Sequence, residues 1–536
     1  MVMRFTILLL ITATSVTADD RPNILFAISD DQSFPHASAY GCDWVNTPGF
    51  DRVAKSGVLF THAFAPTPGC SPTRASILTG RHAWQNREAG THASSFPADL
   101  PTFTAVLEDA GYAVGATGKG WAPGNFRKSG RSKNPAGKGW NQKKNKTPHS
   151  GISGNDYADN FADFLANRSE EAPFCFWYGA HEPHRGFARI QNPSPKQIAD
   201  IDVPGYLPDV PEVRADLRSY AREIEWFDAH LQRMLEQLAD AGELENTIVI
   251  VTSDNGMSFP RAKANLYEDG IHMPLAIAWP KQVPAGRTSA DLVNLIDLAP
   301  TILEAAGIAV PKMMSGRSVL SLLRTEKSGV IEPNRNAVFS ARERHSSSRF
   351  RSLGYPQRSI RTRTHLYIRN YTPERWPAGA PRKFGIGNYP TRNDLAAPKL
   401  GPMHAAYHDI DACPTLSLLT SRHEEPEFAR CLALAVDYRP AEELFDVVAD
   451  PACLVNLAGK AETAAVQTEL ATRLTDKLKE TGDPRESGNG DVFETYPRYS
   501  DVRVFLEPQW AQENPDSAPK QSWLEQKISA KMEQKR

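Results

Sequence analysis

The sequence predicts an α/β protein with a mainly parallel central sheet flanked by helices and a smaller α+β part toward the C-terminus. Helix-like segments alternate with four short apolar runs, at residues 24–28, 112–117, 174–179 and 247–252, as in parallel α/β sheets. The runs lack strict polar–apolar alternation, which is typical of strands buried on both faces. With 536 residues, the chain also exceeds the size at which one core stops growing, about 250–300 residues.

Two helices between these runs have clear ends. Apolar residues recur every three or four positions over residues 211–241, and Gly242 then ends the pattern. We interpret this stripe as core packing. A second helix is predicted over residues 72–79, because Pro72 stands at its start and Gly80 follows its end.

The sequence changes character after about residue 330. Arginine-rich and proline-rich loops there surround one predicted strand at 359–368 and one later helix at 462–480. The expected divisions are an N-terminal domain over 19–330, an α+β part over 331–500 and a polar tail over 501–536.

The first 18 residues are predicted to be a secretory signal. Arg4 precedes an apolar run over residues 5–11, and Val16-Thr17-Ala18 fits the rule for cleavage after a small residue. A membrane anchor is the alternative, but so short a run cannot span ~30 Å of hydrocarbon. We therefore expect a periplasmic or secreted protein with no membrane attachment after cleavage.

The composition excludes several classes of protein. Hydrophobic residues make up 40% and charged residues 23%, which is typical of a folded soluble chain. Lys+Arg 61 against Asp+Glu 63 leaves a net charge of −2, so no basic field indicates a nucleic-acid partner. Six cysteines are too few for a disulfide scaffold, although export permits a pair, for which Cys413 and Cys431 are candidates.

Polar side chains follow each of the four predicted strands. In open α/β sheets, ligands bind at the carboxyl ends of the strands, so we expect these groups to meet at one edge. Each group alone is more often a turn or a solvated cap, but their coincidence favours a site. They are Asp30 and Asp31, Lys119, His181, and Asp254 with Asn255.

The types of side chain at this edge indicate the chemistry. The acidic and amide side chains offer only oxygen ligands, which suit Ca²⁺ or Mg²⁺ rather than zinc. Lys119 and His181 add positive charge and a proton donor. Together these groups describe a site for a tetrahedral oxyanion ester.

Cys70 is the candidate nucleophile. It begins the segment Cys70-Ser71-Pro72-Thr73-Arg74 at the start of a predicted helix, whose dipole favours negative charge there. Arg74 follows about one turn later. The alternative is a buried structural cysteine, the commoner fate of this residue type.

This five-residue segment matches the C-x-P-x-R signature of the type I sulfatases of the alkaline-phosphatase superfamily, which the chain resembles. Residues 75–80, Ala-Ser-Ile-Leu-Thr-Gly, continue the match, and the similarity extends from Arg21-Pro22-Asn23-Ile24 to Glu442–Asp446 and Asp450-Pro451. The resemblance implies an alkaline-phosphatase-like fold and a hydrolase of sulfate esters or sulfamates. It also implies a formylglycine-generating enzyme as the partner that oxidises Cys70 to formylglycine during maturation.

The resemblance implies a role for each residue at the site. Asp30, Asp31, Asp254, Asn255 and modified Cys70 would hold the metal, usually Ca²⁺, with Mg²⁺ the second choice. Arg74 would stabilise the formylglycine, while Lys119, His181 and Lys263 would contact the sulfate. In such enzymes the formylglycine hydrate attacks sulfur in line, His181 protonates the leaving oxygen or nitrogen, and the hydrate then releases sulfate.

Trp121 departs from the family pattern. The family commonly has Gly-Lys-x-His, whereas this chain has Gly118-Lys119-Gly120-Trp121. A histidine that assists sulfate release is therefore missing at this position. Either another residue supplies that base, for which His36 and His92 are available, or the step is slower.

Several stretches resemble the N-sulfoglucosamine sulfohydrolase branch of the family. This resemblance implies a sulfated carbohydrate as substrate, although the same branch includes enzymes that act on other polysaccharides, such as algal ones. The matching stretches are residues 180–185 (Ala-His-Glu-Pro-His-Arg), 214–217 (Arg-Ala-Asp-Leu), 252–256 (Thr-Ser-Asp-Asn-Gly) with Phe259-Pro260, 265–267 (Asn-Leu-Tyr), and 354–356 (Gly-Tyr-Pro) with Arg358-Ser359.

Two basic stretches are candidates for gripping an anionic glycan. Residues 127–146 hold eight Lys/Arg and no Asp/Glu, and residues 342–375 hold nine Arg against Glu343 and Glu374. Solvated surface loops are the commoner interpretation of such runs, but arginine suits bidentate sulfate contacts. The candidate substrate contacts are His92, His184, Arg342, Arg344 and His345.

Two other functions compete with a sulfatase. A phosphate or phosphonate ester hydrolase can carry the same modified cysteine. The other alternative is a catalytically inactive glycan-binding protein, which only Trp121 favours. The presence of all five candidate metal ligands and of Arg74 argues against it.

Overall fold

The computed structural model describes residues 21–190, 193–349, 352–379 and 407–500. The predicted signal at 1–18 and the predicted tail at 501–536 lie outside the described residues. In the described chain, no helix combines the length and the apolar character needed to cross a bilayer.

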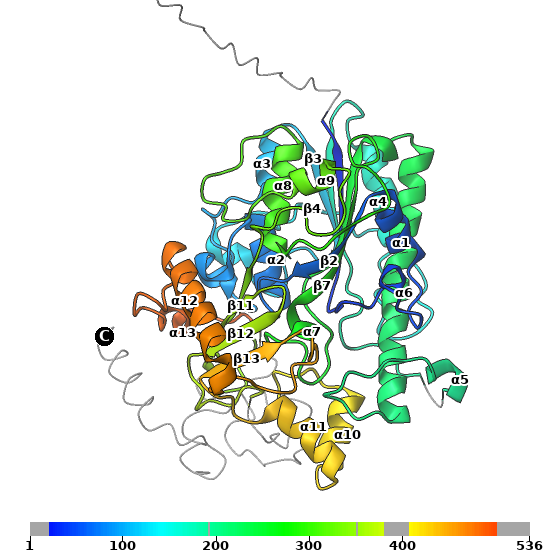
Figure 1. The fold of residues 1–536 in the computed structure, drawn as a ribbon. Helices are drawn as coiled ribbons and strands as arrows, with labels where there is room; N and C mark the ends of the chain where they lie inside the picture. The colour runs from blue at the N-terminus through cyan, green and yellow to red at the C-terminus, as the bar shows by residue number, and fades with distance from the viewer. Residues whose placement is uncertain (1–20, 191–192, 350–351, 380–406, 501–536) are drawn as a thin grey trace, which may run out of the picture.

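The main sheet has nine strands in the described chain, in the order β4-β3-β5-β1-β6-β7-β2-β8, with β9 paired to β2 (Figure 1). In this order, the five strands β4, β3, β5, β1 and β6 are each parallel to their neighbours, and β7 runs antiparallel to both β6 and β2. The expected mainly parallel sheet is confirmed. The strands are β1 Asn23–Ser29, β2 Val58–Phe64, β3 Ala113–Gly118, β4 Lys138–Gly139, β5 Phe174–Gly179, β6 Thr247–Ser253, β7 His272–Ala278, β8 Arg287–Ser289 and β9 Val293–Asn294.

Helices cover both faces of this sheet (Figure 1). Along β1, Leu25 and Ala27 pack against α1, α4 and α6, whereas Phe26 and Ile28 pack against α2, α3, α8 and α9. Both faces of the strand are therefore buried, which explains the missing polar–apolar alternation. The helices are α1 Pro48–Ser56, α2 Cys70–Thr79, α3 Phe103–Asp109, α4 Tyr157–Asn167, α5 Pro195–Ile198, α6 Pro211–Asp240, α7 Glu268–Ile271, α8 Leu298–Ala305 and α9 Leu320–Arg324.

Helix α2 begins two residues before the predicted start at Pro72. Gly69 is extended, with φ −160°, and Cys70 and Ser71 form the first helical residues. Pro72 is tolerated in this first turn because its missing N–H has no intrahelical partner to lose. Cys70 therefore lies at the N-terminus of a ten-residue buried helix.

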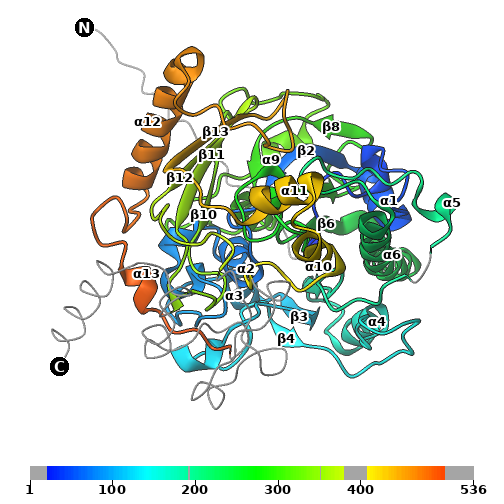
Figure 2. The same ribbon diagram turned by 90° about the horizontal axis from the view of Figure 1, so that it is seen from below.

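The C-terminal part contains a four-stranded antiparallel sheet in the order β10-β11-β12-β13. On β12, Tyr367 packs toward Leu474 of α12, while Leu366 and Ile368 pack toward Phe64 of the main sheet. Figure 2 shows α12 along this sheet, α10 beside α6, and α11 next to α10. The elements are β10 Val338–Arg342, β11 Gln357–Arg361, β12 His365–Asn370, β13 Glu442–Asp446, α10 Pro414–Ser421, α11 Pro426–Val436, α12 Ala464–Glu480 and α13 Val492–Thr495.

The single strand predicted over residues 359–368 is wrong, because the chain reverses between β11 and β12. Thr362 N donates to His365 O (2.9 Å), and Thr362 Oγ1 accepts from His365 N (3.1 Å). A threonine hydroxyl thus closes the turn in a segment without glycine or proline. The predicted division near residue 330 stays a prediction; the second sheet starts at Val338.

The candidate disulfide between Cys413 and Cys431 is also wrong. Both residues are buried free thiols. Cys413 Sγ accepts from Leu416 N (3.3 Å) at the start of α10, and both cysteines pack in one apolar cluster with Leu419 and Phe428. They act as small apolar residues of this cluster.

Candidate active site

The four strands that carry the predicted polar residues end together. Gly118 of β3 and Ile28 of β1 both pair with Gly179 of β5, and Ser29 of β1 pairs with Ser253 of β6. The residues after these strands therefore emerge at one edge of the sheet, as predicted.

Three aspartates from this edge form a buried cluster with Cys70. Asp30, Asp31 and Asp254 are fully buried, and their carboxylates and Cys70 Sγ offer ligand atoms within 4.8 Å of one another. Each carboxylate contacts a different cation. The contacts are Asp30 Oδ2–Lys119 Nζ, 2.5 Å, Asp31 Oδ2–Lys263 Nζ, 2.7 Å, and Asp254 Oδ2–Arg74 Nε, 2.6 Å.

The cluster fits a hard divalent cation. Asp30 Oδ1 and Asn255 Oδ1 are buried and have no hydrogen-bond partner within the described chain. The Asn255 amide donates to Asp31 Oδ1 (2.8 Å), which leaves its own oxygen as an acceptor. Buried oxygens without donors are costly. An all-oxygen set of this kind suits Ca²⁺, and Mg²⁺ less well because it demands a stricter geometry.

Charges in the cluster perturb its carboxyl groups. Burial acts to raise the pKa of Asp30, but the charges of Lys119, His184 and Arg74 outweigh it and hold this pKa well below its usual range. Burial raises the pKa of Asp254 against the opposing charge of Arg74. The ionised form of Asp30 is therefore strongly favoured.

Cys70 and Arg74 lie at the N-terminal end of α2. Cys70 Sγ is 3.8 Å from Asp31 Oδ1. Arg74, fully buried, also donates to the Lys119 carbonyl (2.5 Å) and lies 4.0 Å from Asp30 Oδ1. Its guanidinium is thus held rigidly beside the cysteine.

The cluster borders a pocket of 580 Å³. Asp30 lines this pocket together with Lys119, Lys263 and His181. His92, His184 and His345, three of the predicted substrate contacts, line it as well.

Arg342 and Arg344, the other two predicted substrate contacts, do not line this pocket. Arg342 Nη2 contacts Asp409 Oδ2 (2.7 Å), and Arg344 Nη1 donates to the Tyr496 carbonyl (2.7 Å). The described lining also contains no residue of the basic stretch 127–146.

Sequence reasoning missed three charged residues of the site. Arg185 lines the pocket and pairs with Asp216 (2.5 Å), and Arg498, near the end of the described residues, also lines it. Asp411 contacts Lys263 Nζ (3.1 Å). Arg185 falls in a stretch quoted for the family resemblance, whereas no sequence signal marks the other two.

Trp121 is a core residue. Its side chain is 1% exposed, its indole N–H donates to the Ser71 carbonyl (3.0 Å), and its ring packs edge-on against Phe96. The indole supports the first turn of α2 and offers no base to the pocket.

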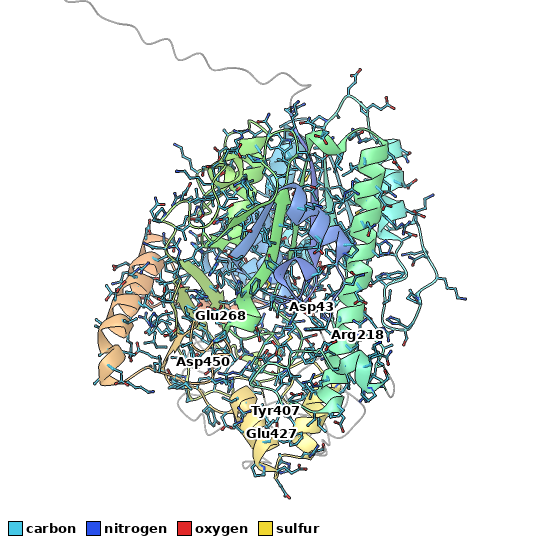
Figure 3. The ribbon with its side chains drawn as sticks, turned by 45° about the vertical axis from the view of Figure 1, so that its right-hand side comes forward. Asp43, Arg218, Glu268, Tyr407, Glu427 and Asp450 are labelled. Atoms are coloured by element: carbon cyan, nitrogen blue, oxygen red, sulfur yellow. The ribbon has the colours of Figure 1, made fainter. Side chains whose placement is uncertain are left out.

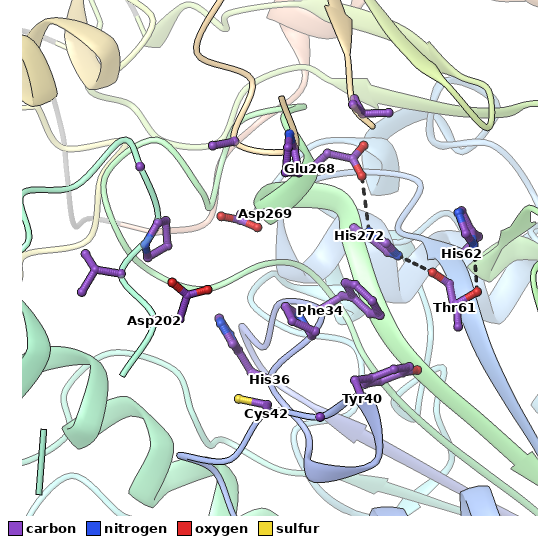
Figure 4. A pocket seen from close by; sticks show the side chains of 18 of the residues that line it. Phe34, His36, Tyr40, Cys42, Thr61, His62, Asp202, Glu268, Asp269 and His272 are labelled. Carbon is purple, nitrogen blue, oxygen red and sulfur yellow. Dashed lines mark hydrogen bonds and ion pairs between the residues drawn. The ribbon is translucent and has the colours of Figure 1, made fainter. Parts of the chain in front are cut away.

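The two histidines that could replace the missing base lie in different pockets. His92 lines the pocket beside the aspartate cluster, with its ring centroid 4.6 Å from that of His345. His36 lines a second pocket of 1010 Å³ with Phe34 and Asp202 (Figure 4), and its Nδ1 is hydrogen-bonded to Tyr220 Oη (3.1 Å). The two pockets share no residue in the described chain.

We expect His92→Gln to lower kcat about 100-fold, because general-base assistance would be lost. His36→Gln is the matched control, because both histidines are buried to a similar degree, with 7% of His36 and 8% of His92 exposed. This control should leave kcat unchanged. Steady-state kinetics of both variants test this. Equal losses would indicate general destabilisation, and an unchanged kcat for His92→Gln would exclude His92 as the base.

Two family models match the chain. The sulfatase model matches residues 22–308, more than half of the chain. The model described as N-sulphoglucosamine sulphohydrolase, C-terminal, matches residues 261–374.

Known proteins resemble the chain over most of its length. An ulvan-active sulfatase from Formosa agariphila is 26% identical over 475 residues, which cover 88% of this chain and 82% of that protein. N-sulphoglucosamine sulphohydrolase from Homo sapiens is 28% identical over 506 residues, covering 86% and 91%. A solved structure described as a complex with its substrate D-glucosamine-2-N,6-O-disulfate has a TM-score of 0.59 at 22% identity and covers 87% and 99% of the two chains, which shows the shared fold.

Proposed function

Since the chain belongs to the sulfatase family and is therefore a hydrolase of sulfuric esters or sulfamates, we propose that it removes sulfate from sulfated carbohydrates with Cys70, oxidised to formylglycine, as nucleophile. The observation that carries this proposal is the buried Cys70–aspartate cluster beside a pocket that Lys119 and Lys263 line. We further propose that the protein is exported, and that a formylglycine-generating enzyme modifies Cys70 during maturation.

The protein's own side chains have distinct tasks in this proposal. Asp30, Asp31, Asp254 and Asn255 hold the divalent ion, which with the modified Cys70 supplies an activated oxygen nucleophile and charge stabilisation. Arg74 keeps the nucleophile oriented, because Asp254 and the Lys119 carbonyl fix its guanidinium. Lys119 and Lys263 stabilise the negative charge on the sulfuryl oxygens.

His181 is the proposed proton donor to the leaving oxygen or nitrogen. Desolvation, and then the charge of Lys119, lower its pKa to about 4, so the free enzyme holds it neutral near pH 7. An anionic sulfate bound beside Lys119 offsets that charge and raises the pKa of His181. A bound sulfate thus acts in the direction that the proposed proton donor needs, toward the protonated form of His181.

The proposed substrate is a sulfated glucosamine, with the N-sulfate tested first. The match of residues 261–374 to the N-sulphoglucosamine sulphohydrolase C-terminal model supports it. The similarity to ulvan-active sulfatases supports a second candidate, a sulfated algal polysaccharide.

Hydrolysis of a panel of substrates tests the proposal, measured as sulfate release from the sulfated compounds and as p-nitrophenol release from the phosphonate. Protein co-expressed with a formylglycine-generating enzyme is assayed with glucosamine N-sulfate, glucosamine 6-O-sulfate, ulvan oligosaccharides and p-nitrophenyl phenylphosphonate. We expect kcat/KM to be highest for glucosamine N-sulfate. A preference for ulvan would move the substrate to the algal class, and a preference for the phosphonate would reject the sulfatase assignment for this chain.

A further inference from the structure

Two buried aspartates reach the pocket region from the C-terminal part of the chain. Asp409 and Asp411 are each 2% exposed. Ile410, between them, packs in the apolar cluster of α10 and α11 and anchors the segment. Tyr407 packs in the same cluster and is labelled near α10 and α11 in Figure 3, and its carbonyl accepts from Ile410 N (2.9 Å).

Asp411 shares the ammonium group of Lys263 with a candidate metal ligand. Lys263 Nζ lies 3.1 Å from Asp411 Oδ2 and 2.7 Å from Asp31 Oδ2. Asp411, Asp31 and His184 offer ligand atoms within 4.8 Å of one another. The Lys263 ammonium thus contacts the carboxylates of both Asp31 and Asp411, and Asp411 offsets part of the positive charge of Lys263.

Asp409 acts on other residues around the pocket. Its carboxylate contacts Arg342 Nη2 (2.7 Å), His345 Nδ1 (3.6 Å) and the guanidinium of Arg349. Burial acts to raise the pKa of Asp409, but Arg349, His345 and Arg342 outweigh it and hold this pKa well below its usual range. The ionised carboxylate therefore lies next to His345, which lines the pocket beside His92.

We propose that Asp411 and Asp409 are positioning residues for two different parts of this pocket. Asp411 limits the positive charge that Lys263 presents to bound sulfate, whereas Asp409 holds the wall of the pocket that contacts the sugar. The inference rests on the proposed function, because it assumes that sulfate and sugar occupy this pocket.

The two carboxylates have different expected effects when neutralised. Asp411→Asn removes a negative charge beside Lys263, so an anion in the pocket is attracted more strongly. Tighter sulfate then leaves more slowly, which lowers kcat where product release limits turnover. Asp409→Asn instead leaves Arg342 and Arg349 without their buried counter-ion, and the wall at His345 loses its fixed orientation.

Binding of the two reaction products tests the proposal without any need for turnover. Calorimetry uses the calcium-loaded full chain with inorganic sulfate and, separately, with glucosamine. We expect Asp411→Asn to bind sulfate about 5- to 10-fold more tightly by removal of one unit charge, and Asp411→Glu to return to the wild-type affinity. Asp409→Asn should leave sulfate binding unchanged and weaken glucosamine binding about 10-fold.

Asp437→Asn is the matched control, because Asp437 is exposed and its loss removes the same charge outside the pocket. A damaged fold weakens both ligands, so tighter sulfate binding by Asp411→Asn is a signature that a structural role does not produce. Unchanged or weaker sulfate binding in Asp411→Asn, or unchanged glucosamine binding in Asp409→Asn, would overturn the corresponding assignment. Absence of turnover by modified wild-type protein rejects the proposed function separately, since both binding measurements are made without catalysis.

Discussion

Replacement of Cys70 by alanine is expected to lower sulfate release at least about 10⁴-fold, which is the usual scale of loss when a nucleophile is removed. Cys70 is buried at the N-terminus of α2, and its Sγ belongs to the aspartate cluster. No other described cysteine reaches that cluster. The measurement is kcat/KM on the best sulfated sugar of the panel.

Mass spectrometry of the peptide across residue 70 accompanies this assay. Exchange of CH₂–SH for an aldehyde lowers the peptide mass by about 18 Da. Cys175→Ala, at a buried free thiol on β5, is the control and should retain both activity and the mass shift at position 70. Activity in a preparation whose Cys70 is entirely a thiol would contradict the formylglycine mechanism.

Removal of the divalent ion is expected to abolish turnover and to lower thermal stability. Three buried carboxylates and the Asn255 oxygen converge at the candidate metal site. Ca²⁺ at about 100 times its Kd would contribute ~2.7 kcal/mol to the free energy of unfolding. Chelation followed by addition of Ca²⁺ or Mg²⁺ should restore both properties, with Ca²⁺ the more effective ion. Thermal unfolding and sulfate release are measured on the same samples.

Asp254→Asn should lose the calcium-dependent stabilisation and about 100-fold or more in kcat, because the ion and Arg74 both lose their carboxylate partner. Asp297→Asn is the matched control. Asp297 also pairs with a buried arginine, Arg335 (3.2 Å), but lies outside the cluster. This variant should unfold at a lower temperature yet keep its response to Ca²⁺. A calcium response that survives in Asp254→Asn would place the ion elsewhere.

Local sequence patterns predicted much of the fold. The runs at 24–28, 112–117, 174–179 and 247–252 each became a strand of the main sheet with ends shifted by one residue at most. These strands are buried on both faces, so their apolar runs are continuous and easily recognised. The turn at Thr362 was missed because a side-chain hydroxyl closes it, and such turns carry no glycine or proline signal.

Contacts between residues far apart in the sequence could not be predicted from local sequence patterns. The free state of Cys413 and Cys431 depends on how α10 and α11 pack, and spacing along the chain carries no information on it. Trp121, at the position that departs from the family pattern, fills a core position under α2, and only the surrounding atoms reveal this packing.

The sequence by itself determined four neighbouring parallel strands of the main sheet, β3, β5, β1 and β6, and the edge of the sheet at which the candidate site lies. Asp30, Asp31, Asp254 and Asn255 directly follow strands, and parallel strands bring their carboxyl ends to one edge. Only the tertiary structure decided which of His36 and His92 reaches the pocket, and that Asp411 meets Lys263. Asp411 lies in an irregular segment whose position depends on packing against α10 and α11, and no local periodicity encodes such a long-range contact.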